Sequence, residues 1–377
     1  MRMANPYDPQ APAKPDYFGG RNSVLSSARE RLRKAIVQDQ SGGLLVYGHR
    51  GVGKTSLLHK IIDIANEEFP GGISFCRRLS RTISNEELYV MLLEELQAQI
   101  HERQNLIEKL RKKGEDISKV KALSIEIDLT RPQLNNSQYQ LWKKAVKHIH
   151  NAEFILVALD DADYLSSEAI GELKTIVENV SQTPVLLVTS GGIQFEKRLV
   201  DEYSPIARIF SGASYNLGRF TLDETKEVLN KPLVSQKTSW EDSAIEQIQK
   251  LTFGYPYLVQ CLASASYLDN ASITKGQVIQ SVEKAVDIGK SWLDHEIPTA
   301  SDKDVMYFLQ LIKLDKDMFR SSEISSLGVP STYIGRLVKL GILKQISRGR
   351  YRLEKSPMVA IYEGLKRRLT NDSTKHP

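Results

Sequence analysis

A glycine-rich run in the first quarter of the chain has the residue types and spacing of a phosphate-binding loop. It reads GHRGVGKTS and fits G-x-x-x-x-G-K-[ST], with the lysine at position 54. In such a loop, backbone N–H groups turn toward phosphate oxygens, the lysine reaches the terminal phosphates, and the threonine hydroxyl faces Mg²⁺. Apolar residues before the run and a helical pattern after it predict strand, loop and helix, the context that the motif requires. The predicted ATP-binding residues are Gly48, His49, Arg50, Gly51, Val52, Gly53, Lys54, Thr55 and Ser56.

Two adjacent aspartates follow the most apolar segment of the chain. Residues 154–159 read FILVAL, and Asp160 and Asp161 come directly after them. Hydrolysis of ATP needs one carboxylate that holds Mg²⁺ and a second group that orients the attacking water. The sequence therefore predicts that Asp160 and Thr55 hold the metal ion and that Asp161 activates water.

The next apolar segment, residues 185–188, ends in Thr189 and Ser190. We expect these hydroxyls to lie between the water and the γ-phosphate. An arginine is also needed for the charge that develops in the transition state. Arg208, in the segment SPIARIF, is our candidate, and Arg198 and Arg219 are alternatives.

The order of apolar segments predicts three domains. Continuous apolar runs separated by helical patterns predict an α/β domain with a parallel sheet, buried on both faces. A proline-spaced N-terminal arm is expected to be extended and unpacked, and a helical region with Gly254-Tyr255-Pro256 follows the sheet domain. The expected boundaries are 1–16 for the arm, 17–220 for the P-loop ATPase domain with a charged helical insertion at about 85–122, 221–295 for a helical lid, 296–369 for a winged helix and 370–377 for a tail.

The C-terminal region has three helical patterns and two strand patterns joined by SRGR, which predicts a winged helix. Residues 301–377 hold 15 Lys and Arg against 8 Asp and Glu, whereas the first 300 residues hold 36 against 38. Such a basic surplus is typical of nucleic-acid-binding modules, and a solubilising basic face is the alternative. The predicted DNA-binding residues are Arg336, Lys339, Arg348, Arg350 and Arg352.

The bulk composition narrows the class of protein. The 377 residues are 41% hydrophobic and 26% charged, as in ordinary globular domains, and the two cysteines form no metal or redox pattern. The sequence contains neither an 18-residue apolar segment nor an apolar signal core. We therefore expect a cytoplasmic protein that does not interact with membranes.

In its motifs the chain resembles AAA+-type ATPases. The segments FGGR, GHRGVGKTSLL, FILVALDDADYL, VLLVTS and SPIARIF occur in the order found in that group. Within it, the chain is similar to the origin-recognition initiators and to STAND ATPases, which implies a nucleotide domain, a helical lid and a winged helix. Pro256 corresponds to the proline of the STAND Gly-x-Pro lid motif, which implies contact with the nucleotide. Two features depart from the initiator pattern, because residues 257–268 contain no arginine and Asp161 stands where many members have glutamate. Both favour a slow nucleotide switch.

Three interpretations of function remain. In the first, a slow Mg²⁺-dependent ATPase switch binds double-stranded DNA through its winged helix. In the second, a STAND-type signalling or defence ATPase uses the winged helix as an autoinhibitory or protein-interaction module. The third, a weaker one, is an ATPase that loads protein partners. The resemblance also implies self-association through the ATPase domain, and the helical insertion is a candidate binding site for a protein partner.

Overall fold

The computed structural model describes residues 5–113, 124–125, 138–147, 149–150, 152–178, 183–234 and 236–373. The chain divides into two compact units. The sheet unit consists of Arg21–Gly218, and the helical unit consists of Met1–Gly20 together with Arg219–Pro377.

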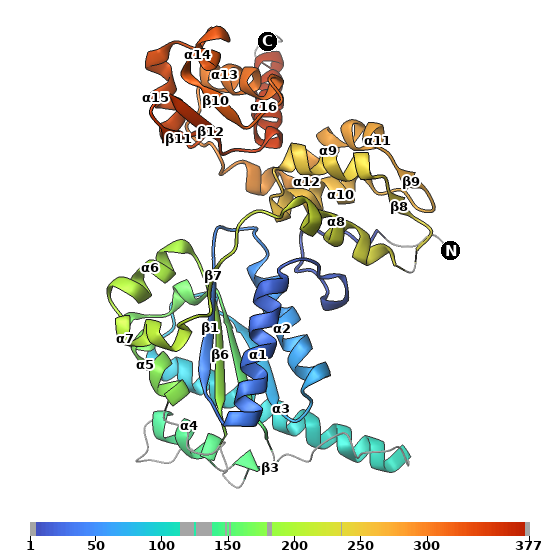
Figure 1. Cartoon of the computed structure of the whole chain (residues 1–377). Coiled ribbons are helices and arrows are strands. Elements are labelled where there is room, and N and C mark those ends of the chain that lie inside the picture. Colours follow the sequence, from blue (N-terminus) through green and yellow to red (C-terminus); the bar gives the residue numbers. More distant parts are fainter. Residues whose placement is uncertain are drawn as a thin grey trace. The chain divides into compact units, whose positions relative to one another are not determined.

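The sheet unit is built on five parallel strands in the order β2-β5-β6-β1-β7 (Figure 1). This arrangement confirms the predicted α/β class with a parallel sheet. Its strands are β1 Gly42–Tyr47, β2 Ile73–Arg78, β5 Ile155–Asp160, β6 Val185–Gly191 and β7 Ser214–Asn216, and a separate small pair is β3 Ser124–Ile125 with β4 Ile149–His150. Its helices are α1 Asn22–Gln38, α2 Lys54–Glu68, α3 Asn85–Lys113, α4 Gln138–Lys147, α5 Ser167–Glu178, α6 Ile193–Asp201 and α7 Ser204–Ala207, with short 3-10 turns at Ala162–Tyr164 and Arg208–Phe210.

Helices cover both faces of the sheet, which is why its strands are apolar throughout. On one face, residues of α3, α4 and α5 form a core with alternate strand residues such as Leu45, Val157 and Leu187. On the other face, α1 and α2 lie against the intervening positions, including Leu44 and Val188. Every residue of β5 and of β6 is buried. Because parallel strands end at the same edge, the segments that follow β1, β2, β5 and β6 gather there.

The charged insertion begins as a single long helix. α3 runs without interruption from Asn85 to Lys113. The rest of the expected insertion, up to residue 122, lies outside the described residues.

The helical unit combines the predicted lid with the predicted winged helix. Its lid part contains α8 Leu222–Asn230, α9 Asp242–Thr252, α10 Pro256–Ser266, α11 Lys275–Gln280 and α12 Val282–Leu293, with 3-10 turns at Pro15–Tyr17 and Lys231–Leu233. The lid is not purely helical, because β8 Ser239–Trp240 pairs in parallel with β9 Ser272–Ile273. A capping box at Thr221 starts α8, as its sequence predicts.

The N-terminal arm packs against this lid, which differs from the unpacked arm expected from its prolines. Tyr7 is 3% exposed, and its hydroxyl donates to the carbonyl of Leu229 at 2.5 Å. The same hydroxyl accepts from the indole N–H of Trp240 at 2.8 Å. A single aromatic side chain therefore anchors a segment whose proline spacing alone indicated an extended arm.

The C-terminal part has the elements of a winged helix and an additional strand. It comprises α13 Asp302–Lys313, β10 Met318–Arg320, α14 Ser321–Ser326, α15 Ser331–Lys339, β11 Leu343–Ser347, β12 Arg350–Leu353 and α16 Pro357–Ser373. The three strands form an antiparallel sheet in the order β10-β12-β11. α16 continues through residues 370–373, which were expected to belong to the tail.

The winged-helix and lid parts share one hydrophobic core within the helical unit. Ion pairs join them as well: Lys366 with Asp294 at 3.0 Å and Lys250 with Asp315 at 2.5 Å. Two further pairs lie beside this interface, Lys355 with Glu296 at 2.5 Å and Arg219 with Glu354 at 3.7 Å. The two sequence-predicted domains therefore pack as one unit in this structure.

Candidate active site

The glycine-rich run forms the loop between β1 and α2. Gly48 and Gly53 have φ values of 150° and 90°, which L side chains rarely adopt. A Cβ atom on Gly48 would also lie 2.6 Å from the carbonyl oxygen of Leu217. α2 begins at Lys54, directly after the loop, so its N-terminal N–H groups face the loop as the phosphate-binding hypothesis requires.

Lys54 supplies the cation of this loop. Its ammonium donates to the carbonyl of Gly48 at 2.9 Å and to that of His49 at 3.1 Å. Burial lowers the pKa of Lys54, while the charges of Asp161, Asp163 and Asp160 act in the opposite direction. The lysine therefore sits over its own loop in an acidic surrounding, where phosphate oxygens can replace the two carbonyls as its acceptors.

Asp160 joins the phosphate loop to the neighbouring strand. It is fully buried at the end of β5, and its Oδ2 accepts from the Thr55 hydroxyl at 2.7 Å. Its Oδ1 accepts from the hydroxyl of Ser190 on β6. A hydroxyl and a carboxylate side by side are the oxygen ligands that Mg²⁺ prefers, so this donor set fits a magnesium nucleotide.

Asp161 is turned away from its neighbour by an unusual backbone conformation. Its φ of 57° and ψ of 46° lie in the left-handed region, which aspartate tolerates better than most residues. The backbone N–H of Asp161 donates to Ser190 Oγ at 3.2 Å, and its carboxylate accepts from Arg78 Nε at 2.9 Å. The carboxylate of Asp161 is thus exposed enough to meet water and is held by one guanidinium.

Of the two predicted hydroxyls, the structure brings only Ser190 to Asp160. Successive strand residues point to opposite faces, and Thr189 lies on β6 opposite Leu159 and Leu45, on the α3–α5 side of the sheet. Thr189 is fully buried, and its Oγ1 has no hydrogen-bond partner among the described residues. The position of Thr189 therefore does not support its predicted catalytic role. Because successive residues of β6 point to opposite faces of the sheet, only one of the two hydroxyls can face Asp160.

The candidate arginines lie in three different places. Arg208 begins the 3-10 turn after α7 and is exposed, and Arg198 is half-buried on α6. Arg219 belongs to the helical unit, where it donates to the carbonyl of Glu354 and stacks over Phe253 at 5.5 Å. Burial lowers the pKa of Arg219. Pro256 is also in the helical unit, as the first residue of α10.

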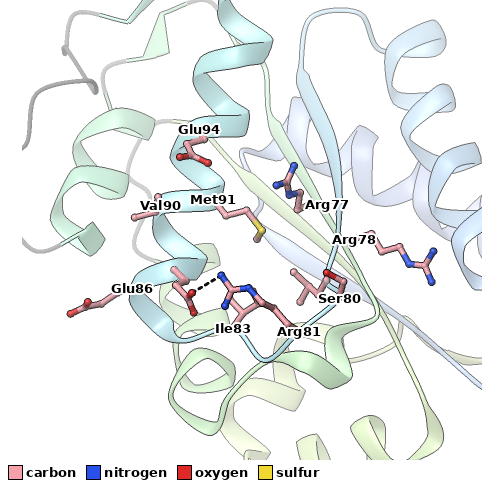
Figure 2. Close-up of a pocket in the computed structure, with 11 residues that line it drawn as sticks. Arg77, Arg78, Ser80, Arg81, Ile83, Glu86, Val90, Met91 and Glu94 are labelled. Carbon is pink, nitrogen blue, oxygen red and sulfur yellow. Dashed lines mark ion pairs between the residues drawn. The ribbon is translucent and has the colours of Figure 1, made fainter.

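Sequence reasoning missed Arg78, which reaches Asp161 from the end of β2. Arg78 pairs with Asp160 in the sheet register, so its strand lies directly beside β5. A groove of about 440 Å³ lies here, between the end of β2 and α3. Arg77, Arg78 and Arg81 are among its lining residues (Figure 2). Arg77 pairs with Glu95 at 2.8 Å and Arg81 with Glu87 at 2.7 Å. The signal in the sequence was the basic pair that ends the second strand.

The predicted DNA-binding residues lie on a helix, a turn and a strand of the C-terminal part. Arg336 on α15 donates from Nε and Nη2 to the two carboxylate oxygens of the buried Asp304, both at 2.7 Å. Lys339 is exposed at the end of α15. Arg348 lies in the turn between β11 and β12, and Arg350 and Arg352 lie within β12. Arg336 therefore stabilises the domain in this structure, a role that its helical position alone did not indicate.

Comparisons with known proteins agree with this fold. Residues 18–188 match the family model described as AAA ATPase domain, and residues 308–353 match that of the transcriptional regulator AbiEi antitoxin. No curated protein matches the chain. The Walker-type ATPase PABY2304 of Pyrococcus abyssi is a similar structure, with 20% identity, a TM-score of 0.50 and coverage of 92% of this chain and 95% of that one. The ORC2 protein of Aeropyrum pernix, solved in ADPNP and ADP complexes, has 14% identity, a TM-score of 0.51 and coverage of 93% and 94%.

The chain thus carries an AAA+-type P-loop ATPase domain, resembles origin-recognition proteins in fold, and ends in a domain of the winged-helix type. Among the described residues, no helix is long and apolar enough to cross a bilayer.

Proposed function

We propose that the chain is a slow, Mg²⁺-dependent ATPase switch that binds double-stranded DNA through its winged-helix domain. The observation that carries the ATPase part is the contact of Asp160 with both Thr55 and Ser190. This contact joins the phosphate loop to the ends of two central strands. The DNA-binding part is supported by the basic surplus of the C-terminal region and by its match to a transcriptional regulator.

The residues divide the chemistry among them. Loop N–H groups and Lys54 hold the phosphates, and Thr55 and Asp160 hold Mg²⁺, which when bound neutralises phosphate charge. Asp161 orients the attacking water and accepts its proton. Ser190 fixes Asp160 through its hydroxyl and receives the N–H of Asp161, so it holds both carboxylates in register.

Arg78 restrains this chemistry in the proposed switch. Its bond to Asp161 Oδ2 occupies an oxygen that would otherwise accept a proton from water. The side chain of Arg78 in this ion pair is 70% exposed. Such pairs are weak and exchange readily. Together with the aspartate at the catalytic position, this contact favours slow hydrolysis.

Self-association through the ATPase domain is part of the proposal. Arg208 is exposed, and no acidic partner of its side chain is found within the described residues. Those features suit an arginine that acts on the nucleotide of a neighbouring subunit. Arg208→Ala should then lower turnover only at protein concentrations where subunits assemble. An equal loss far below and far above the assembly threshold would place the arginine in its own active site.

The second candidate function is a STAND-type ATPase in which the winged helix is an intramolecular clasp. The specific observation in its favour is that ion pairs join the winged-helix and lid parts, Lys366 with Asp294 and Lys250 with Asp315. Within the helical unit, Arg219 also pairs with Glu354 of the winged helix at 3.7 Å.

A salt titration of DNA binding distinguishes the DNA-binding switch from the STAND-type ATPase. In the proposed function, log affinity for a duplex falls linearly with log salt between about 50 and 200 mM. Absence of duplex binding at about 50 mM salt would contradict DNA binding and would favour the clasp.

A further inference from the structure

The three-stranded sheet of the winged-helix domain has one buried and one exposed face. Phe319 of β10, Leu343 of β11 and Leu353 of β12 point inward and are at most 2% exposed. The alternate residues of each strand therefore point outward. We call this exposed side the outer sheet face; it consists of Met318, Arg320, Arg350, Arg352 and Lys344, and of Ser347, which a β-bulge between Gln345 and Ser347 brings opposite Arg350.

Strand register places cations next to one another on the outer sheet face. Arg320 lies opposite Arg350, and Arg352 lies between Met318 and Lys344. All four basic side chains are exposed. Like charges directly opposite each other on a sheet destabilise it. An arrangement of this kind is costly for the free protein and favourable when a polyanion lies across it.

Nearby carboxylates compensate this charge only partly. Glu354 pairs with Arg352 at 2.7 Å. Glu323 accepts from the backbone N–H of Arg320 at 2.6 Å and pairs with Lys316 at 2.5 Å. Within the described residues, no ion pair is formed by Arg350 or Lys344.

The other candidate DNA contacts in the domain are fewer than the sequence suggested. Arg336 is held by Asp304, which leaves Lys339 as the cation of α15 without a described ion pair. The wing does not project freely either, because the carbonyl of Gly349 accepts from the N–H of Ser321 at 2.9 Å. That bond ties the hairpin turn to the start of α14. Four exposed basic side chains of the domain therefore share one face of its sheet.

We propose that the outer sheet face binds the phosphate backbone of duplex DNA, with Arg320 and Lys344 as contact residues beside Arg350 and Arg352. The inference rests on the proposed DNA-binding function and adds its binding surface. Phosphate contacts carry no base information, so this surface fixes the position of the duplex and does not read its sequence. Nucleic acid is favoured as the occupant because duplex DNA carries one negative charge per about 1.7 Å of its axis, so several phosphates are available to cations on adjacent strands.

The test uses the full chain, a labelled duplex of about 30 base pairs and salt between about 50 and 200 mM. The variant Arg320→Gln with Lys344→Gln should lower the slope of log affinity against log salt by roughly 2, one step for each lost phosphate contact. It should weaken two duplexes of unrelated sequence by the same factor. The matched control is Lys303→Gln with Lys313→Gln, which removes two exposed charges from α13 and should leave the slope unchanged. Thermal unfolding of both variants checks that each is folded.

The possible failures are distinct. If the Arg320 and Lys344 variant binds as wild type does, while Lys339→Gln with Arg348→Gln abolishes binding, the outer sheet face is wrong and DNA binding stands. If the α13 control lowers the slope equally, binding follows net charge and the assigned surface is wrong. If wild-type protein binds no duplex at about 50 mM salt, the proposed function itself fails.

Discussion

Arg78 at the end of β2 donates from Nε to Asp161 Oδ2 at 2.9 Å, so the carboxylate expected to activate water is paired with a neighbouring strand's guanidinium. Arg78 and Asp160 are direct neighbours in the sheet register. That neighbour relation positions Arg78 beside the aspartate that follows β5.

Loss of this pair should raise basal hydrolysis. Arg78→Ala frees Asp161 Oδ2, and an exposed ion pair is worth at most about 1 kcal/mol, which corresponds to a rise of up to about fivefold in turnover. Steady-state ATPase assays measure it. Arg81→Ala is the matched control, because Arg81 pairs with Glu87 and not with a catalytic residue. A fall in turnover for Arg78→Ala would mean that the arginine assists Asp161.

The two aspartates should give different defects. Asp160→Asn weakens the metal site formed with Thr55, so Mg²⁺-dependent ATP affinity should fall. Asp161→Asn leaves that contact intact, so ATP should still bind while hydrolysis drops on the order of 100-fold or more. Equilibrium binding and single-turnover hydrolysis separate the two steps. Identical phenotypes would show that the roles are wrongly divided.

Variants of Ser190 and Thr189 test which of these successive residues of β6 faces the active site. Ser190→Ala removes a hydrogen bond to the buried carboxylate of Asp160, worth roughly 1.5–3 kcal/mol, and should slow hydrolysis about tenfold or more. Thr189→Val keeps the shape of a side chain whose hydroxyl has no described partner, so hydrolysis should stay near wild type. The reverse order of effects would place Thr189 in the site.

The sequence predicted the parts of the site that local pattern determines. A glycine loop between strand and helix defines Lys54 and Thr55, and a buried strand that ends in Asp160 meets them wherever the sheet is parallel. Arg78 could not be deduced, because strand neighbours depend on sheet order. The distinction between Thr189 and Ser190 depends on strand phase, which a fully apolar strand does not reveal. Tyr7 likewise packs on residues 222 and more positions away in sequence.

In the winged helix too, the sequence did not reveal a tertiary contact, the pairing of Arg336 with Asp304, and this contact leads to a stability prediction. Asp304 is buried, which opposes its ionisation, but the bonds from Arg336, Tyr333 and Ser301 outweigh burial and hold its pKa below the ordinary value. Arg336→Ala leaves a buried carboxylate without its cation and should measurably lower the free energy of unfolding. Lys339→Ala, on the same helix, should change it by less than about 0.5 kcal/mol. Denaturant unfolding measures both.

The sign of the pH dependence follows from the lowered pKa. The contribution of Asp304 is fully present above its unfolded pKa of about 4 and is lost as the pH falls further. Arg336→Ala should therefore lose most of its stability deficit relative to wild type in acid. Equal stability of the Arg336 and Lys339 variants at neutral pH would show that the ion pair does not stabilise the domain.

In the proposed switch, bound nucleotide controls the affinity for DNA, and the most direct test is duplex affinity measured in two nucleotide states. Asp161→Asn loaded with Mg²⁺-ATP, and the same variant with Mg²⁺-ADP, should differ at least about fivefold in duplex affinity at fixed salt, the lower end of ordinary coupling energies. Lys54→Ala, which should not hold ATP tightly, provides the baseline without nucleotide dependence. Equal affinities of the Asp161→Asn protein in its ATP and ADP states would contradict the account.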